Sequence, residues 1–309
     1  MPTEFPSIDW STKVAADCRD LVGLSIREDL GRQHDWTTVA LVPAGTPGSA
    51  CIVSRTAGVV AGLTAIPTIL DAIEAKVQWT PQTNDGDLIS AQQSLGRLTG
   101  DVRQILTAER TILNILGRLS GVATLTRRFV DAVSHTPVRI YDTRKTTPGW
   151  RSLEKYAVHC GGGFNHRLSL ASAIMIKDNH LAAAANTPWN TIPLAIQRVR
   201  EFVEHNVPDP RTIVIELEVD SLEQLTDALH AQPDIVLLDN MSTETLRQAV
   251  QLRNQLAPNV VLEASGGVTL DTVAAIAETG VDRISVGAVT HSAVNHDIAL
   301  DWDFAHAYR

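Results

Sequence analysis

Short apolar runs alternate with segments of helical spacing through the second half of the chain. Six runs have the length and apolar character of strands, and three segments between the later runs place apolar residues at helical intervals. The strand candidates are 138–142, 173–177, 212–218, 235–239, 260–263 and 283–286, and the helix candidates are 221–231, 243–256 and 270–279. Regular strand-then-helix units predict a parallel sheet, and runs that are apolar on both sides predict that this sheet is buried on both faces.

The strand candidates finish in charged or small residues. These terminal residues are Asp142, Lys177, Glu218, Asp239, Glu263 and Gly287. In a β/α barrel the carboxyl ends of all the strands meet at the face that carries the active site. In an open doubly wound sheet only the residues near the switch point come together. Because polar ends recur along the whole series, we expect a closed barrel, with an open sheet as the alternative. No Gly-x-Gly-x-x-Gly turn follows a strand, so a dinucleotide-binding fold has no support.

The first third of the chain predicts a mixed α/β region. We expect a helix over 14–30, strands over 50–55 and 58–61, a helix over 64–75 and a long helix from 102 to about 133. The first helix should end at Gly31, because glycine commonly follows a helix C-terminus. Gly117 and Gly121 lie inside the long helix, so that helix either breaks there or packs closely against another segment.

The composition favours a globular protein that acts on small molecules. The chain has 309 residues, 44% of them hydrophobic, and a formal net charge of −9. This negative charge argues against binding to nucleic acid or to anionic membranes. No secretory signal is visible, and the longest uncharged stretch, 56–70, is too short to span a membrane. Cys18, Cys51 and Cys160 are far apart and odd in number, so we expect free thiols and a cytoplasmic location.

A group of basic residues gathers within residues 138–180 of this acidic chain. Its members are Arg144, Lys145, Arg151, Lys155, His159, His166, Arg167 and Lys177. Guanidinium groups bind carboxylate or phosphate through two hydrogen bonds, and an ammonium group supplies a point charge. We therefore expect a pocket for a small polyanion, with a solvated loop of ordinary surface charge as the alternative. His159 and His166 could also be metal ligands, but no third ligand stands at a suitable spacing.

Glu218 and Asp239 end neighbouring strand candidates and would face one cavity. Two such carboxylates could bind a divalent cation with its waters, face a developing positive charge, or act as a general acid/base pair. A salt bridge from Glu218 to Lys177 or Lys145 is the structural alternative. Glu216 lies two residues earlier and points to the same face, so the sequence leaves open which glutamate is functional.

Glycines follow the last two strand candidates, where many barrels bind phosphate. Ser265–Gly267 follows one strand and Gly287 follows the other, and glycines allow backbone N–H groups to approach an anion. These features indicate substrates that carry carboxylate and phosphate groups. A lysine Schiff-base aldolase with Lys145 or Lys177 as its nucleophile fits the same pattern.

Three motifs in the basic stretch are specific enough to indicate a family. They are Thr143–Gly149 (TRKTTPG), Asn165–Arg167 (NHR) and Ile176–His180 (IKDNH). Further motifs extend along most of the chain, namely EDLG at 28–31, GVVAG at 58–62, AERTILN at 108–114, ELE at 216–218, LLDN at 237–240, EASGG at 263–267 and ISVG at 284–287. Together they resemble the nicotinate-nucleotide pyrophosphorylase (carboxylating) family, also called quinolinate phosphoribosyltransferase.

The resemblance implies a reaction and an architecture. Quinolinate and 5-phosphoribosyl 1-diphosphate would give nicotinate mononucleotide, diphosphate and carbon dioxide with the help of Mg²⁺, a step of NAD biosynthesis that needs no redox cofactor. Residues 1–115 would form an α/β sandwich domain, residues 116–290 an incomplete parallel β/α barrel with the active site, and the tail 291–309 would return to the first domain. The family implies at least a homodimer, in which Arg110 reaches the pocket of the neighbouring subunit.

The resemblance also implies roles for individual residues. Those expected to hold the quinolinate carboxylates are Arg110, Arg144, His166, Arg167 and Lys177. Those expected to hold the phosphates are Lys145, Ser265, Gly266, Gly267 and Gly287. Glu218 and Asp239 would bind the ribose hydroxyls or Mg²⁺, and together with Lys145 they are the expected catalytic residues. The alternatives are a relative acting on another pyridine acid such as nicotinate, a relative with a role in metal-cofactor handling, or a barrel that only binds a phosphorylated ligand.

Overall fold

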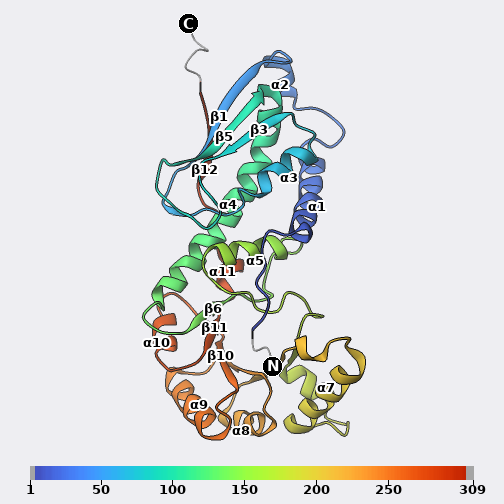
Figure 1. The fold of residues 1–309 in the computed structure, drawn as a ribbon, viewed down its shortest axis with the longest axis vertical. Helices are drawn as coiled ribbons and strands as arrows, with labels where there is room; N and C mark the ends of the chain where they lie inside the picture. The colour runs from blue at the N-terminus through green and yellow to red at the C-terminus, as the bar shows by residue number, and fades with distance from the viewer. Residues whose placement is uncertain (1–3, 304–309) are drawn as a thin grey trace. The chain divides into compact units, whose positions relative to one another are not determined.

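The computed structural model describes residues 4–303, which form two compact units that each draw on separate stretches of the chain (Figure 1). One unit, here called the barrel unit, comprises residues up to 7 together with 128–145 and 163–288. The other, here called the sandwich unit, comprises 8–127, 146–162 and the residues from 289 onward. The domain boundaries expected from the sequence, after residues 115 and 290, remain a prediction.

The barrel unit is built on a six-stranded sheet in which every pair of neighbours is parallel. Its strands are β6 (Arg139–Tyr141), β7 (Ile174–Ile176), β8 (Ile215–Val219), β9 (Ile235–Asp239), β10 (Val261–Ser265) and β11 (Arg283–Ser285). The spatial order is β6-β11-β10-β9-β8-β7, so consecutive strands are neighbours and the first strand follows the last. This is the strand order of a barrel and not that of a doubly wound sheet, which reverses at a switch point.

The barrel is incomplete. Among residues 4–303 no ladder joins β6 to β7, and the sheet is extended beyond β6 only by a parallel bridge between Tyr141 and Phe164. Both edge strands are three residues long, and six strands fall short of the eight that close the common β/α barrel. The expected closed barrel was therefore wrong, whereas the incomplete barrel implied by the family motifs is confirmed.

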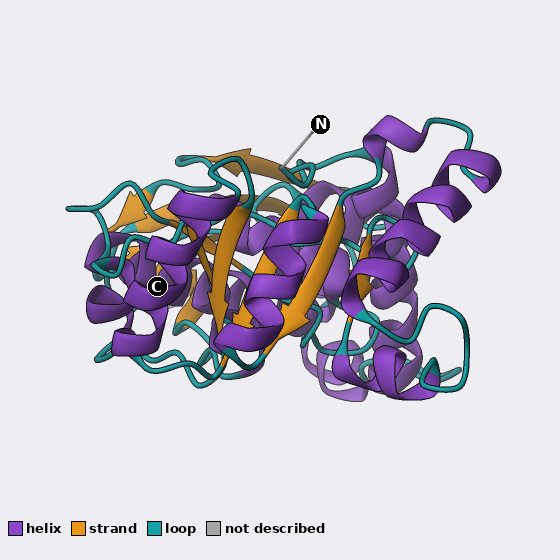
Figure 2. Cartoon of the chain, turned by 90° about the horizontal axis from the view of Figure 1, so that it is seen from below, coloured by secondary structure: helices purple, strands orange, loops and turns teal. Residues whose placement is uncertain are grey.

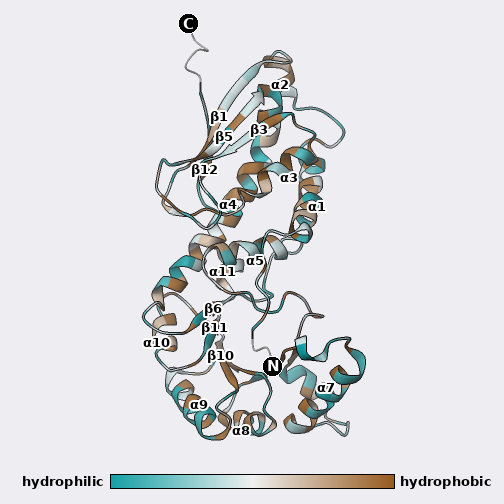
Figure 3. Ribbon diagram, in the orientation of Figure 1, coloured by the Kyte–Doolittle hydropathy of each residue, from teal (hydrophilic) through white to brown (hydrophobic). Residues whose placement is uncertain are grey.

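Helices cover the strands of the barrel unit, as Figure 2 shows. They are α6 (Asp178–Ala183), α7 (Ile192–Asn206), α8 (Leu222–Ala231), α9 (Thr243–Leu256) and α10 (Val273–Ala277), with a short 3-10 turn at Pro210–Thr212. Ser221 and Ser242 cap α8 and α9, because each side chain accepts a backbone N–H of the first turn. Figure 3 shows that α7 and α9 each carry hydrophobic and hydrophilic residues, as expected of helices that pack on a sheet with one face.

The sandwich unit contains a four-stranded antiparallel sheet in the order β12-β1-β5-β3. Its strands are β1 (Pro47–Ser54), β3 (Val77–Pro81), β5 (Ser94–Asp101) and β12 (Ile298–Trp302), and a small ladder joins β2 (Gly58–Val59) to β4 (Leu88–Ile89). Its helices include α1 (Thr12–Asp29), α2 (Trp36–Leu41), α3 (Ala65–Ala72) and α5 (Arg151–Cys160). The pairing of β12 with β1 brings residues near the end of the chain onto the sheet of its first third.

The long helix α4 (Val102–Ala132) is unbroken at its glycines. A Cβ on Gly121 would lie 2.1 Å from the carbonyl oxygen of Val294, and one on Gly117 would lie 3.1 Å from that of His296. These glycines therefore serve close packing, the second of the two possibilities that the sequence allowed. A further short helix, α11 (Ala288–His291), precedes Val294 and His296 in the chain. Within the described part of the chain, no helix is both long and apolar enough to cross a membrane.

Candidate active site

A cavity of about 540 Å³ opens at the carboxyl ends of the barrel strands. All the residues that line it belong to the barrel unit. Those expected from the sequence are Arg144, Lys145, His166, Arg167, Lys177, Glu218, Asp239, Ser265, Gly266 and Gly267. The structure therefore brings together ten of the residues that the motifs assigned to substrate binding.

The pocket is the upper level of a layered barrel interior. Alternate residues of a strand point to one face, so on β10 the interior positions are Val261, Glu263 and Ser265, from the base of the barrel to the pocket. On β8, Glu216 is fully buried whereas Glu218 lines the pocket. The interior thus changes from apolar residues at the base, through buried charges, to an accessible polar pocket. Barrel interiors are usually filled with branched apolar residues, so a charged middle layer is unusual.

The basic wall of the pocket comes from three segments. Arg144 and Lys145 follow β6, His166 and Arg167 follow the bridge at Phe164, and Lys177 follows β7. Burial, and next the positive charge of Arg144, lower the pKa of Arg167. The buried Nε of Arg144 has no hydrogen-bond partner within residues 4–303. Crowded guanidinium groups with an unused donor are suited to an anionic ligand, because such a ligand satisfies both the charge and the donor.

The acidic wall consists of Glu218 and Asp239. Glu218 forms an ion pair with Lys177, and both side chains remain partly exposed. Asp239 accepts a hydrogen bond of 3.1 Å from the side-chain amide of Asn240. Glu218, and not Glu216, is therefore the pocket carboxylate on β8. The sequence also allowed Glu218 to form a purely structural salt bridge with Lys177. This salt bridge is present, but both of its residues line the pocket.

The turn after β10 requires its glycines. Gly266 and Gly267 have φ values of +94° and +59°, in the region that favours glycine. A Cβ on Gly266 would lie 2.4 Å from Oδ1 of Asn240, a residue that itself has φ of +53°. The backbone consequently comes close to the pocket, where its N–H groups can contact an anion. Gly287 is not among the described residues that line the pocket.

A buried charge cluster lies in the layer below the pocket. His166 Nε2 is 3.0 Å from Glu216 Oε2 and 3.4 Å from Glu263 Oε1, and Arg283 Nε is 3.9 Å from Glu263 Oε2. Burial alone would lower the pKa of His166, but the two carboxylates outweigh it and raise this pKa to about 10. Burial also raises the pKa of Glu216. The cluster therefore retains a proton, on His166 or shared with Glu216, which balances its charge together with Arg283.

The same cluster has ligand atoms close enough to hold a metal ion, since those of His166, Glu216 and Glu263 all lie within 4.8 Å of one another. Its hydrogen bonds nevertheless favour a proton. The backbone nitrogen of Arg167 lies 2.8 Å from His166 Nδ1, and Nε2 faces the two carboxylates, so a proton on Nε2 can be donated to either carboxylate. A metal ligand would instead need a free lone pair at Nε2.

Glu218 and Asp239 fit a different kind of metal binding. No third His, Cys or carboxylate joins these two in a ligand cluster anywhere in the described residues. Mg²⁺ is commonly held by one or two carboxylates together with substrate phosphates, rather than by a complete set of protein ligands. The pair therefore fits a magnesium ion that is bound jointly with a phosphorylated substrate.

Some expected residues lie elsewhere. Arg151, Lys155 and His159 belong to α5 of the sandwich unit and do not line the pocket, because the segment that contains them forms a helix and not a loop. Nε2 of His159 is 3.4 Å from Asp9, and among the described residues His159 belongs to no cluster of metal-ligand atoms. Arg110 lies on α4 of the sandwich unit with an exposed side chain.

Two predicted strand ends are buried and do not reach the pocket. Glu263 lies in the middle of β10, and Asp142 accepts hydrogen bonds from the side chain of Asn165 and the backbone N–H of His166, at 2.7 and 2.9 Å. Five pocket residues were not among those expected from the sequence, namely Thr143, Met175, Leu237, Asn240 and Ser285. Strand alternation gives a signal for two of them, since Met175 and Leu237 stand two residues before Lys177 and Asp239.

The fold and the pocket define an α/β protein whose incomplete barrel carries, at its carboxyl edge, a pocket lined by basic and acidic side chains. A sequence profile described as "Quinolinate phosphoribosyl transferase, C-terminal domain" matches residues 122–301, and the corresponding N-terminal profile matches residues 35–120. The chain belongs to the quinolinate phosphoribosyltransferase family.

Known relatives match along almost the whole chain. A nicotinate-nucleotide pyrophosphorylase [carboxylating] of Mycobacterium leprae is 42% identical over 285 residues, which cover 92% of this chain and 96% of the relative. A mitochondrial quinolinate phosphoribosyltransferase [decarboxylating] of Nicotiana glauca is 36% identical, with 93% and 82% covered. The solved structure of the nicotinate-nucleotide pyrophosphorylase from Francisella tularensis has a TM-score of 0.86 and 34% identity, and the match covers 97% of this chain and 100% of that one.

Proposed function

We propose that this chain is a quinolinate phosphoribosyltransferase, a pentosyltransferase that releases carbon dioxide. It converts quinolinate and 5-phosphoribosyl 1-diphosphate into nicotinate mononucleotide, diphosphate and carbon dioxide, a step of de novo NAD biosynthesis. The observation that carries this proposal is the pocket itself, in which a crowded basic wall faces Glu218 and Asp239 beside a glycine turn. A dicarboxylate and a phosphorylated sugar need these two kinds of surface side by side.

The basic wall holds the pyridine dicarboxylate. Arg144, His166, Arg167 and Lys177 supply positive charge from one side of the pocket. Planar guanidinium groups bind carboxylates through two parallel hydrogen bonds, so they orient the pyridine ring as well as binding it. The unused Nε of Arg144 supports a direct contact to the substrate. This orientation directs the ring nitrogen toward the sugar carbon that it attacks.

Lys145 of the basic wall and the glycine turn after β10 together hold the phosphoribosyl group. Lys145 and the backbone N–H groups of Ser265–Gly267 are suited to phosphate, because the glycine turn lets the main chain approach an anion. Gly287 follows β11 but is not among the described residues that line the pocket. Its role in phosphate binding is expected only from the family motif. Glu218 and Asp239 bind the ribose hydroxyls and face the sugar carbon.

The charges of the pocket match the charges that develop during the reaction. As diphosphate leaves, positive charge grows on the sugar carbon, and Glu218 and Asp239 stabilise it, while Lys145 stabilises the departing phosphate oxygens. The ring nitrogen becomes cationic when it bonds to the sugar. That positive charge stabilises the carbanion formed as the adjacent carboxylate leaves as carbon dioxide. The chain therefore needs no covalent intermediate with the protein and no redox cofactor.

Mg²⁺ is the expected cofactor. Glu218 and Asp239 would hold it together with the substrate diphosphate, since they offer two carboxylates and the described residues add no third ligand. When bound, Mg²⁺ would neutralise charge on the diphosphate and make it a better leaving group.

The active unit is expected to be a homodimer or a larger homo-oligomer. Arg110 is exposed on α4 and is not among the lining residues of the pocket, which supports a role toward the pocket of a second copy. The three cysteines, Cys18, Cys51 and Cys160, are free thiols, which favours a reducing, cytoplasmic location.

The test is a comparison of two pyridine acids. Purified protein is incubated with Mg²⁺ and 5-phosphoribosyl 1-diphosphate, and with either quinolinate or nicotinate, and mononucleotide formation is followed. We expect product from quinolinate only. Product from nicotinate without carbon dioxide release would instead identify a relative with a different acceptor, and binding of the phosphorylated sugar without any product would favour a binding protein.

A further inference from the structure

Asn240 stands between the acidic wall of the pocket and its glycine turn. It follows Asp239 at the end of β9, and its side-chain amide donates a hydrogen bond of 3.1 Å to Oδ2 of Asp239. Its Oδ1 lies against the turn after β10, only 2.4 Å from the position that a Cβ on Gly266 would take. One side chain therefore lies beside both a carboxylate and the turn to which the sugar and its phosphates are assigned.

The backbone around Asn240 gives this amide a defined position. The N–H of Asn240 donates to the carbonyl oxygen of Ser265 at 2.9 Å, which joins the end of β9 to the end of β10. Asn240 has φ of +53°, a conformation that asparagine adopts more readily than most other residues. Because residue 266 is a glycine, the space beside the turn is open to the amide. The side chain is thus placed before any ligand enters the pocket.

The two carboxylates of the acidic wall are held by different kinds of partner. Glu218 pairs with the charged Lys177, whereas the partner of Asp239 is the neutral amide of the next residue. Asp239 takes part in no ion pair within residues 4–303. A neutral donor fixes the orientation of a carboxylate without cancelling its charge. Asp239 consequently keeps its full negative charge for a cation or for a positively charged sugar carbon.

We propose that Asn240 is a positioning residue for Asp239 and for the turn after β10, and through them for binding of the phosphorylated sugar together with Mg²⁺. This inference rests on the proposed function and adds to it a residue to which no role has been assigned. The side chain of Asn240 makes no hydrogen bond with the basic wall within the described residues, so recognition of the dicarboxylate should not depend on it.

The test compares two variants of the full chain. Asn240→Gly removes the amide and keeps the positive φ without strain. Asn240→Asp keeps the size of the side chain and its tolerance of positive φ, but it replaces the donor with a second carboxylate that repels Asp239. Calorimetry measures the dissociation constants of quinolinate and of 5-phosphoribosyl 1-diphosphate with Mg²⁺, and Tm reports on stability.

We expect both variants to bind 5-phosphoribosyl 1-diphosphate with Mg²⁺ about tenfold more weakly than the wild type, because Asp239 loses the group that orients it. The dissociation constant of quinolinate should change by less than about twofold, because the basic wall is unaltered. The comparison between the two ligands within one variant is therefore the readout that a merely structural role would not produce.

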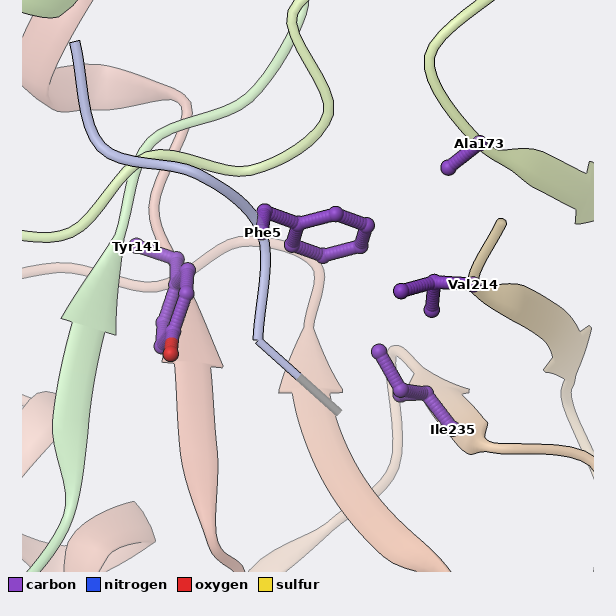
Figure 4. Packing of buried hydrophobic residues seen from close by; sticks show 5 residues of the cluster. All are labelled: Phe5, Tyr141, Ala173, Val214 and Ile235. Atoms are coloured by element: carbon purple, nitrogen blue, oxygen red, sulfur yellow. The ribbon is translucent and has the colours of Figure 1, made fainter. Parts of the chain in front are cut away.

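Two controls separate this effect from changes of backbone or stability. Gln232→Gly places a glycine at another positive φ, of +52°, directly after α8 and outside the pocket. Ile235→Ala weakens the start of β9, the strand that ends at Asp239. Ile235 belongs to a buried apolar cluster with Phe5, Tyr141, Ala173 and Val214 (Figure 4). Ile235→Ala should lower Tm, and both controls should bind the two ligands with affinities near those of the wild type.

Wild-type affinity for the phosphorylated sugar in Asn240→Gly would overturn the proposal. The same affinity in Asn240→Asp would overturn it too, because it would show that filling the space beside the turn is sufficient. Equal weakening in Ile235→Ala, or an equal loss of quinolinate affinity in the Asn240 variants, would show a general disturbance of the pocket and would also overturn it. A wild-type protein that binds the phosphorylated sugar but not quinolinate would count against the proposed function instead, so the two failures are distinguishable.

Discussion

Lys177 and Glu218 form an ion pair at the pocket, between the ends of the neighbouring strands β7 and β8. Two residues earlier on β8, Glu216 contacts His166 in the closed interior. One strand therefore presents two carboxylates to different surroundings, one accessible and one fully buried. We assign chemistry to the accessible glutamate and structural support to the buried one.

This assignment predicts opposite effects for two alanine substitutions on β8. Glu218→Ala should lower kcat by about a hundredfold or more, because it removes charge that faces the sugar carbon, and it should change stability by less than about 1 kcal/mol because the pair is partly exposed. Glu216→Ala should cost about 3–5 kcal/mol of stability by leaving His166 with one carboxylate fewer in the interior. Urea unfolding measures the change in the free energy of unfolding, and steady-state kinetics measures the change in kcat. The assignment would be contradicted if the two variants lost kcat and stability in the same proportion.

Arg144 should dominate recognition of the dicarboxylate. Arg144→Ala should weaken quinolinate binding by about 2–5 kcal/mol, because it removes the charged contact that we propose the substrate makes and buries on binding. Isothermal titration with quinolinate measures the loss, and Arg211→Ala is the matched control because that side chain is 88% exposed and outside the pocket. Wild-type affinity in Arg144→Ala would refute this role.

The buried charge cluster predicts how stability depends on pH. The pKa of His166 is raised from its ordinary value of 6.5 to about 10, so the folded protein holds this proton more tightly than the unfolded chain does. The resulting stabilisation is complete below pH 6.5 and is lost as the pH rises toward 10. We therefore expect Tm to fall between pH 7 and 10, more steeply than in Glu216→Gln, which lacks one of the two carboxylates that retain the proton. Parallel curves for the two proteins would contradict the account.

Complementation between subunits tests the role of Arg110. If Arg110 serves the neighbouring pocket, Arg110→Ala and Lys145→Ala should each be nearly inactive alone, but a dimer of one copy of each contains one intact site. Co-expression with random pairing should recover about a quarter of the wild-type activity, since half the dimers are mixed and each has one working site. If Arg110 serves the pocket of its own chain, no activity should return.

The sequence predicts regular elements well where local pattern decides the structure. β9 and α9 begin and end at the predicted residues, because a continuous apolar run and a helical repeat with a serine cap define them. The sequence also predicts that the pocket residues lie at one edge of the sheet, because they stand at the carboxyl ends of the strands and strand alternation points them to the same side.

The remaining features depend on partners that are distant in the sequence. Burial of Glu263 is possible because His166 and Arg283 lie beside it, and no local pattern distinguishes it from an exposed strand end. The helix α5 was missed because two of its charged residues, Glu154 and Lys155, are fully buried and disguise its apolar face. Glu154 is paired with Arg118, which lies 36 residues earlier.

The central claim is that sugar transfer and decarboxylation occur together in this pocket. The most direct test supplies quinolinate labelled with ¹³C in the carboxylate next to the ring nitrogen, together with 5-phosphoribosyl 1-diphosphate and Mg²⁺, and measures labelled carbon dioxide and mononucleotide in one reaction. The account predicts equal amounts of the two products, and loss of both in Arg144→Ala. Mononucleotide that keeps the label, or carbon dioxide released without mononucleotide, would contradict it.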